Sequence, residues 1–573
     1  MGVGITEDRV LKYKTNTQRG VTRSLTAVLM LLLMVGCGSD RQNVDLVISG
    51  GAVYTMNPAQ PRADALAISG GRIVAVGSSA QIKSRYRGTD EIELGGQMVL
   101  PGFVDSHVHP VDGGAGLMQC GLDELTTVDA LVAKIKACDA NEPGAGWLLG
   151  RGWDLSLFPA ANPNKALLDA ISTQRPILLR GADGHSSWAN SKALALAGIG
   201  RETKNPPNGV IERDPATGEP TGTLRETAGE LVRAIVPPFS AQQREEGLLR
   251  ALAMANGFGI TSIVEAAADG DDLAAYEQID KRGQLTARVV ASIDIKDPNA
   301  DALMHAQERG TSARLRTDAA KIFIDGVLEG ETAALLAPYL DHPEHLGQLN
   351  HTPEELTARV VDLDRRGIQV HMHAIGDRAV RVALDAVAAA RAANGASDNR
   401  HHIAHLQLVD PADRARFAQL GVVANIQALW AFPDKYITDV NLPQVGQARV
   451  NEMYPFASLA RAGATIVGGS DWPVSPMNPL LAIETALTRA DPRGGTAKIL
   501  NADERMTLAD MLAAYTTNGA YLMHQEHDTG TLEVGKFADL VILERNLFDV
   551  PPDEIGEVVV TRTLLEGKTV FAR

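Results

Sequence analysis

The chain has 573 residues, of which 45% are hydrophobic and 22% are charged, the proportions of an ordinary globular protein large enough for several domains. Its 54 Lys and Arg residues against 70 Asp and Glu leave a formal net charge of −16, and it contains no polybasic run. This balance argues against nucleic acid as a partner and against attachment to an anionic membrane through surface charge.

Residues 1–36 are expected to be a signal peptide rather than part of the fold. A basic segment, residues 9–23, precedes an apolar run at residues 25–36 that is too short to span a bilayer. The run ends at Cys37, followed by Gly-Ser-Asp, and resembles a bacterial lipoprotein signal; an ordinary secretory signal is the alternative. We therefore expect a tether over residues 37–43 and a lipid on Cys37 as the only link to a membrane. The protein would then lie in the cell envelope, in the periplasm or at the outer membrane.

Short apolar strands are expected at both ends of the remaining chain. Residues 44–48 form one strand, residues 67–76 form a hairpin across a Gly-Gly turn, and residues 538–542 nearly repeat the first strand. This repeated strand pattern predicts one small β-sandwich domain built from residues 44–98 and 530–573.

Between these ends, apolar strands alternate with helical segments, which is the pattern of a parallel α/β sheet. Eight strands with helices between several of them predict a (β/α)8 TIM-like barrel over residues 99–110 and 236–529, with a doubly wound sheet as the alternative. The expected strands are Met98–His109, Gly259–Glu265, Arg288–Ile295, Lys321–Asp325, Gln369–His373, His401–Leu406, Val422–Ile426 and Thr465–Ser470.

The gap between the first and second strands is far too long for a loop. Residues 111–235 are therefore expected to be a large insertion after barrel strand 1 that covers the barrel mouth as a lid; a spacer or a dimer surface is the other interpretation. Within it, Trp153 and Trp188 would either line an apolar pocket or form the core of the insertion. Cys120 and Cys138 could pair in an oxidising compartment or stay free.

Polar residues follow the apolar strands at several places. In a barrel, functional groups gather at the carboxyl ends of the strands. The first strand ends in His107-Val-His109, whose imidazoles point the same way, and Asp105 on that face could orient one of them. The other polar residues are Lys321 at the start of the fourth strand, His371 and His373 in the fifth, His401, His402 and His405 in the sixth, and Asp471 after the eighth.

Histidine and carboxylate ligands suit Zn²⁺ and related divalent ions, and no Cys-x-x-Cys motif offers thiolates instead. A catalytic ion of this kind lowers the pKa of a water toward neutrality. Asp471 is a candidate to accept the proton of that water and return it to a leaving nitrogen.

Six segments together resemble the amidohydrolase superfamily, and in particular its family 3, which includes N-substituted formamide deformylases. The resemblance extends from about Val44 to the C-terminus. The segments are Leu100–His109, Lys321–Gly326, His373–Asp377, Arg400–His405, Gly469–Pro473 and Gly535–Leu540.

The resemblance implies a metal site with one or two ions, most simply zinc. In a site of this kind His107, His109 and Asp471 would hold the more buried ion, and Asp471 would be the general acid and base. His373 and His405 would hold the second ion.

For a two-ion site, the resemblance implies that Lys321 is carboxylated by CO₂ and bridges the metals, since an ammonium cannot be a ligand. The alternative is an ordinary lysine that is solvated or neutralises Asp325. His371, His401 and His402 would then have orienting or structural roles.

In the insertion, His185 is a candidate catalytic residue that polarises a substrate carbonyl or closes over the site. The predicted function is a metal-dependent hydrolase that cleaves the C–N bond of a small amide or N-formyl substrate. The same machinery acting on cyclic amides, imines or esters is one alternative, and a non-catalytic substrate-binding lipoprotein is another. A homodimer is expected from similar enzymes.

Overall fold

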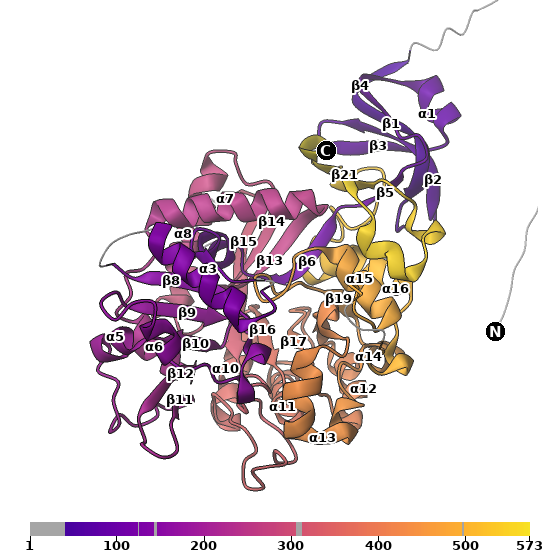
Figure 1. Ribbon diagram of the computed structural model, residues 1–573. Coiled ribbons are helices and arrows are strands. Elements are labelled where there is room, and N and C mark those ends of the chain that lie inside the picture. Colours follow the sequence, from indigo (N-terminus) through magenta and orange to yellow (C-terminus); the bar gives the residue numbers. More distant parts are fainter. Residues whose placement is uncertain (1–40, 124, 142–145, 305–311, 495–497) are drawn as a thin grey trace, which may run out of the picture. The chain divides into compact units, whose positions relative to one another are not determined.

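The computed structural model describes residues 41–123, 125–141, 146–304, 312–494 and 498–573. The predicted signal peptide, Cys37 and most of the predicted tether lie outside these residues. The described chain contains three β-sheets, with eight, six and eight strands (Figure 1). In this part of the chain, no helix combines the length and the apolar character needed to cross a membrane.

One eight-stranded parallel sheet forms a nearly closed barrel, which confirms the predicted TIM-like α/β fold. Its two outermost strands meet because the Asp471 N–H donates to the His107 carbonyl (2.7 Å) and the His109 N–H donates to the Trp472 carbonyl (2.9 Å). In sheet order the strands are β6 (Phe103–Val108), β13 (Ile260–Ala268), β14 (Arg288–Asp294), β15 (Leu315–Phe323), β16 (Gln369–Ala374), β17 (His402–His405), β18 (Val423–Ile426) and β19 (Ile466–Gly468).

Helices follow most of these strands, and several begin at a side-chain cap. Asp269, Thr352 and Asp410 each accept a hydrogen bond from a backbone N–H of the first turn that would otherwise lack a partner. The helices of the barrel region are α7 (Ala241–Gly257), α8 (Gly270–Lys281), α9 (Ala300–Met304), α10 (Pro353–Arg365), α11 (Asp377–Asn394), α12 (Pro411–Leu420), α13 (Leu442–Val450), α14 (Phe456–Arg461), α15 (Pro479–Thr488), α16 (Leu508–Ala514) and α17 (Thr517–Leu522).

Strand β15 begins earlier than the sequence indicated. It starts at Leu315, so that Lys321 is near the carboxyl end of the strand and not at its start. The apolar pattern missed this start because Arg316 and Asp318 interrupt it; their side chains pair with each other at 2.7 Å. The correction places Lys321 at the end of the barrel where functional groups gather.

Strands from both ends of the described chain form a second hydrogen-bonded network. Its order is β22-β21-β20-β5-β1-β2-β3, and β4 pairs with β1. The sandwich arrangement of this region stays a prediction. The elements are β1 (Gln42–Tyr54), β2 (Arg62–Ser69), β3 (Arg72–Gly77), α1 (Ser79–Arg85), β4 (Tyr86–Glu93), β5 (Met98–Pro101), β20 (Leu540–Leu543), β21 (Val560–Leu565) and β22 (Lys568–Ala572).

The expected strand Met98–His109 is in fact two strands in different sheets. Its first part, β5, pairs with β1 and β20, whereas β6 belongs to the barrel. The chain crosses between the sheets at Gly102, whose N–H donates to the Asp539 carbonyl (2.9 Å) and where a Cβ would lie 2.1 Å from Thr261 Oγ1. The boundary therefore lies at Gly102 and not at Met98. The apolar run did not reveal it, because both sheets bury this segment.

The insertion contains a third sheet, in the order β11-β12-β10-β9-β8-β7. Trp153 and Trp188 are fully buried in its core, with ring centroids 5.9 Å apart, which decides between the two interpretations of these residues. The elements are α2 (Pro110–Gly116), β7 (Cys120–Gly121), α3 (Val128–Asn141), β8 (Leu148–Trp153), α4 (Ala166–Asp169), β9 (Ile177–Gly181), β10 (Ser186–Ala189), α5 (Ser191–Leu196), β11 (Gly209–Arg213), β12 (Pro220–Glu226) and α6 (Thr227–Arg233).

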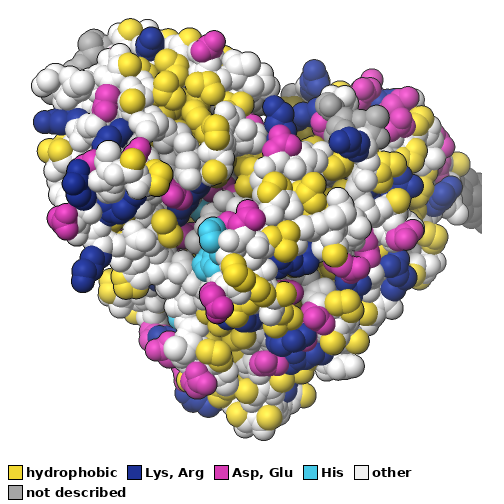
Figure 2. All heavy atoms as spheres, turned by 60° about the horizontal axis from the view of Figure 1, so that its bottom comes forward, with side chains coloured by type: hydrophobic (Ala, Val, Ile, Leu, Met, Phe, Trp, Pro, Cys, Tyr) yellow, Lys and Arg dark blue, Asp and Glu magenta, His cyan; other side chains and the backbone are white. Residues whose placement is uncertain are grey.

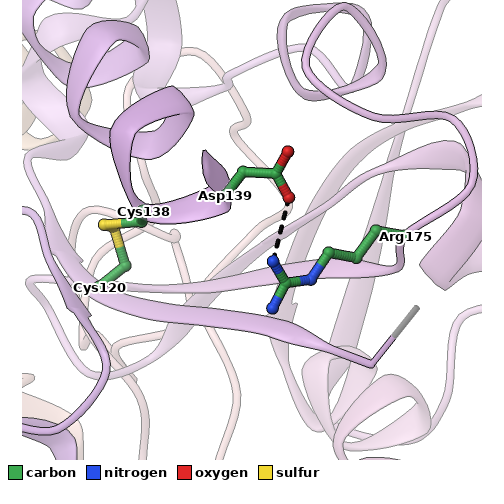
Figure 3. The surroundings of a disulfide bond; sticks show 4 residues. All are labelled: Cys120, Cys138, Asp139 and Arg175. Carbon is green, nitrogen blue, oxygen red and sulfur yellow. Dashed lines mark hydrogen bonds and ion pairs between the residues drawn. A yellow bond between two sulfur atoms is a disulfide. The ribbon is translucent and has the colours of Figure 1, made fainter. Parts of the chain in front are cut away.

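Cys120 and Cys138 form a disulfide that joins β7 to α3 (Figure 3). The residue after Cys138, Asp139, accepts a hydrogen bond from the guanidinium of Arg175 at 3.1 Å. Helix α3 is therefore fastened to the rest of the insertion at two neighbouring positions.

Asp364, near the end of α10, is a buried carboxylate that joins three segments. Its Oδ1 accepts hydrogen bonds from Arg391 of α11 (2.8 Å), from the Ser397 hydroxyl (2.7 Å) and from the His401 imidazole (2.9 Å). Burial by itself would raise the pKa of Asp364, but His401 and the other donors outweigh it and hold the pKa well below its usual range.

Asp364→Asn is expected to lower the free energy of unfolding at neutral pH by about 3 kcal/mol, because buried charged partners are left unpaired. Since the folded-state pKa is lowered, ionised Asp364 contributes stability above the unfolded-state pKa of about 4 and loses it as the pH falls further. The difference between wild type and variant should therefore shrink by up to about 1.4 kcal/mol per pH unit below that value. Urea unfolding between about pH 3 and about pH 7 measures the difference.

The control is Asp385→Asn on α11, whose side chain is 58% exposed and is expected to contribute little at any pH. If the effect of Asp364→Asn were the same at both ends of the pH range, the stabilising role of its charge would be disproved.

Candidate metal centre

The residues predicted to bind metal lie at the carboxyl ends of the barrel strands. The register of the parallel strands brings residues of neighbouring strands side by side: Lys321 of β15 pairs with His371 of β16, and Phe323 pairs with His373. His107 lies in β6 with His109 just after it, Lys321 lies in β15, His373 in β16 and His405 in β17, and Asp471 follows β19.

Three of these residues form a compact group. One possible ligand atom from each of His107, His109 and Asp471 lies within 4.8 Å of the other two. Asp471 Oδ1 lies 3.2 Å from the Nε2 atoms of both His107 and His109. The two imidazoles and the carboxylate thus face one point, as in a divalent metal site.

The remaining predicted residues complete the cluster. His405 Nδ1 lies 3.9 Å from Asp471 Oδ2, and the ring centroids of His405 and His373 are 4.5 Å apart. Lys321 Nζ lies 3.4 Å from His107 Nε2. The structure therefore brings all six predicted ligands together at one centre.

The polar atoms of this cluster fit a bound cation. His405 Nδ1 and Asp471 Oδ1 are buried and have no hydrogen-bond partner among the described residues. Buried polar atoms without partners are uncommon in folded proteins, so each needs an explanation. Bound metal would give each of these two atoms a partner.

The electrostatics of the cluster favour the protonation states that bind metal. Burial and the charge of Lys321 lower the pKa of His107 to about 3. Burial also lowers the pKa of Lys321 to about 8. Burial opposes ionisation of Asp471, yet His107 and His109 outweigh it and hold the pKa of Asp471 well below its usual range. Neutral imidazoles and an ionised carboxylate are the ligand forms that a divalent ion requires.

Two buried side chains lie beside the Nδ1 atoms of His107 and His109, whose Nε2 atoms face Asp471. His371 Nε2 lies 2.9 Å from His107 Nδ1, within hydrogen-bond distance. Glu265 Oε1 lies 3.7 Å from His109 Nδ1. The His-x-His pattern pointed to His371, but nothing in the sequence pointed to Glu265, because an acidic residue in an apolar strand does not reveal what it faces.

The neighbouring histidines have separate roles. His402 packs against His371, with the ring centroids 4.0 Å apart and the ring planes tilted by 33°. His401 instead binds Asp364 and accepts a hydrogen bond from the Val370 N–H, which makes it part of the fold.

Asp105 contacts the backbone and not an imidazole, contrary to the prediction. Its carboxylate accepts hydrogen bonds from the N–H groups of His107 (3.2 Å) and Ser470 (2.9 Å). Asp105 therefore ties the first barrel strand to the segment that precedes Asp471, and so helps to hold the ligands of both segments together.

The insertion brings His185 to the cluster, with its ring centroid 5.3 Å from that of His373. His185 Nδ1 donates to Glu226 Oε2 (2.9 Å), and Glu226 Oε1 accepts a hydrogen bond from the Thr332 hydroxyl (2.8 Å). Burial alone would lower the pKa of His185, but Glu226 outweighs it and raises the pKa to about 9. Glu226 has φ 48°, a strained backbone conformation for a residue with a side chain. The sequence offered no signal for Glu226.

A cavity of about 980 Å³ opens onto the cluster. Its lining includes His107, Lys321 and Asp471 of the barrel together with Arg151 and His185 of the insertion. Figure 2 shows a hollow on one face of the protein, with histidine, acidic and basic side chains visible beside it. A molecule in the cavity would contact both the barrel and the insertion.

Comparisons with known proteins agree with this arrangement. Residues 90–571 match the model of the amidohydrolase family. The chain is 34% identical to the protein LONG AFTER FAR-RED 3 of Arabidopsis thaliana, over 92% of this chain and 91% of that protein. It is 27% identical to the N-substituted formamide deformylase of Arthrobacter pascens, over 92% of this chain and 98% of that enzyme.

A solved structure of a metal-dependent hydrolase from Pyrococcus horikoshii matches with a TM-score of 0.70 and 27% identity, covering 88% of this chain and 99% of that one. The family match spans the barrel and the strands β5, β20 and β21 of the flanking sheet, and the histidine and aspartate cluster lies within it. The chain therefore belongs to the amidohydrolase family, whose members are metal-dependent hydrolases.

Proposed function

We propose that the protein hydrolyses the C–N bond of a small amide or N-formyl substrate. The observation that carries the proposal is the position of Asp471, whose Oδ1 lies 3.2 Å from the Nε2 atoms of two histidines and faces the cavity. The similarity to a formamide deformylase over nearly its whole length supports the choice of a C–N bond.

The ligand set would be the one that the sequence predicted. His107, His109 and Asp471 would hold one ion, and His373 and His405 would hold a second, with zinc as the simplest candidate. When bound, such an ion lowers the pKa of a water and polarises a carbonyl.

Lys321 would join the two halves of the site as a carbamate. Its amine is fully buried, with a pKa lowered to about 8, and it forms no ion pair with a described carboxylate. A neutral amine can add to CO₂, and the resulting anion would match the cationic site, whereas an ammonium would be repelled by it.

Two residues of the chain would transfer the proton and polarise the carbonyl group. The Asp471 carboxylate would take a proton from the attacking water and deliver it to the nitrogen as the C–N bond breaks. His185, held by Glu226, would donate a hydrogen bond from Nε2 to the carbonyl oxygen as negative charge develops there. The products would be a carboxylic acid and an amine. Because the insertion provides His185, it would act as a lid over the barrel.

The test removes the metal from the full chain with a chelator and assays simple N-formyl amines, acyl amides, cyclic imides and esters before and after Zn²⁺ is restored. We expect turnover of formamides or amides that is lost on chelation and recovered with Zn²⁺. Turnover of only esters or cyclic imides would favour the alternative substrates. Binding without turnover in every metal state would instead favour a substrate-capturing protein.

We also propose that the protein lies in the cell envelope, anchored by a lipid on Cys37. The disulfide between Cys120 and Cys138 supports an oxidising compartment. Mass spectrometry of the N-terminal peptide from membrane fractions would detect a diacylglyceryl group on Cys37, and an unmodified peptide there would contradict the proposal.

Glu226→Gln is expected to lower kcat by about 10- to 100-fold with a smaller change in KM, because His185 loses the carboxylate that orients it. His185→Gln should have a similar effect. The double variant should be no slower than the slower single variant, since both changes remove the same interaction.

The matched control is Glu219→Gln, an exposed change in the same insertion whose carboxylate pairs only with Arg201 in the described structure. Additive losses in the double variant, or a melting temperature that falls in parallel with kcat, would assign Glu226 a purely structural role.

A further inference from the structure

Two arginines lie side by side on the wall that the insertion contributes to the cavity. Arg151 of β8 and Arg180 of β9 are register partners on adjacent parallel strands. Both side chains line the cavity that opens onto the histidine and aspartate cluster. Like charges on neighbouring positions of a sheet repel each other, so such a pair needs compensating anions.

Among the described residues, Arg180 has the closer carboxylate of the two arginines. Arg180 donates to Asp112 through Nη1 and to the Gly184 carbonyl through Nε (3.2 Å). Arg151 Nη2, in contrast, lies 3.9 Å from Asp123 Oδ2, beyond hydrogen-bond distance, and Arg151 Nε is buried without a partner among the described residues.

The other two cavity arginines, Arg233 and Arg244, also bury an Nε without a partner among the described residues, but each has a carboxylate closer to its guanidinium than the 3.9 Å between Arg151 and Asp123. Arg233 pairs with Glu230 at 2.8 Å, and Arg244 pairs closely with Asp272. The Arg151 side chain is only 11% exposed, so water compensates its charge poorly. Consistent with this, burial lowers the pKa of Arg151.

Arg151 also lies close to the proposed reacting centre. Its guanidinium carbon is 5.8 Å from the ring centroid of Trp472, the residue after Asp471. Gly116 of α2 leaves room for the side chain, because a Cβ at that position would lie 2.6 Å from Arg151 Cδ. The protein thus holds an incompletely paired guanidinium between the insertion and the catalytic end of the barrel.

We propose that Arg151, next to Arg180, binds a carboxylate of the substrate. The planar guanidinium presents parallel N–H donors that match a carboxylate, and a charge-assisted pair of this kind is strong when it is shielded from water. The substrate class would then be N-formyl or N-acyl amines that carry an acid group away from the scissile bond. This inference rests on the proposed C–N hydrolysis and names the substrate class of the same site.

The test compares acid and neutral members of matched pairs in the zinc-loaded full chain. The probes are ω-formamido acids of increasing length, from N-formylglycine to 6-formamidohexanoate, each assayed beside its primary carboxamide. For at least one length, we expect wild type to show a kcat/KM at least about tenfold higher for the acid than for the carboxamide. Arg151→Gln should abolish this ratio, and Arg151→Lys should retain part of it because the charge remains.

A binding measurement separates this inference from the proposed function. Unsubstituted alkanoates and their amides are titrated calorimetrically into wild type, Arg151→Gln and the control Arg201→Gln, which changes an exposed arginine of the insertion. Melting temperatures check that each variant is folded.

A preference for alkanoates that is lost only in Arg151→Gln, without turnover of any formamide or amide, would sustain the carboxylate site and overturn the proposed hydrolysis. Equal kcat/KM for acid and carboxamide at every length would overturn the inference and leave the hydrolysis standing. A preference that persists in Arg151→Gln would also overturn it, because the carboxylate would then bind elsewhere, for example at the metal.

Discussion

Asp471→Asn is expected to lower kcat/KM by about 10²- to 10⁴-fold, the range for loss of a general acid and base. The amide has the shape of the carboxylate but cannot accept the proton of the attacking water. It also removes the charge that faces His107 and His109 at 3.2 Å, so the affinity for the metal should fall as well. Steady-state kinetics on a formamide, with metal content measured on the same sample, checks both effects.

The control for Asp471→Asn is Asp528→Asn, which changes an exposed aspartate that pairs with Arg72 far from the cluster in sequence. Assays at saturating Zn²⁺ separate the two roles of Asp471, because added metal can restore occupancy but not the lost base. Activity within about tenfold of wild type under these conditions would rule out Asp471 as the proton-transfer group.

Lys321→Ala is expected to reduce activity by at least about 100-fold and to be partly rescued by formate, acetate or propionate. The variant removes the only side chain at this position that could become a bridging anion, and a small carboxylic acid can occupy the space that it leaves. Lys321 is fully buried 3.4 Å from His107 Nε2, so the added acid would lie where the carbamate is proposed. Activity against acid concentration, with metal content in parallel, measures the rescue.

Lys296→Ala is the matched comparison, since Lys296 lines the same cavity and, like Lys321, lies over the ring of Phe323, with 5.4 Å from its Nζ to the ring centroid against 4.8 Å for Lys321. Small acids should not restore whatever activity this variant loses. If folded Lys321→Ala kept two metal ions without added acid, or if acids never changed its rate, the carbamate proposal would fail.

The barrel strands and the polar residues that gather at their ends could be predicted from local patterns. Buried parallel strands are apolar on both faces and therefore stand out as short runs, and polar residues at their ends mark the functional rim. The same rule failed for β15, because Arg316 and Asp318 in its first half compensate each other and hide the strand. The apolar run from β5 through β6 looked like one strand, because such a run does not show which sheet buries each part of it.

The sequence by itself determined which donors are available: the two His-x-His pairs, Lys321, His405 and Asp471, each placed by its strand. Only the tertiary structure decided how they are supported and what surrounds them. Glu226 meets His185 across the insertion, Glu265 faces His109, and Arg151 lies 3.9 Å from the Asp123 carboxylate. Local sequence determines strands and turns through short-range sterics and periodicity. The charge balance of a buried group depends instead on which distant segments fold against it, and this pairing is decided by the packing of the whole chain.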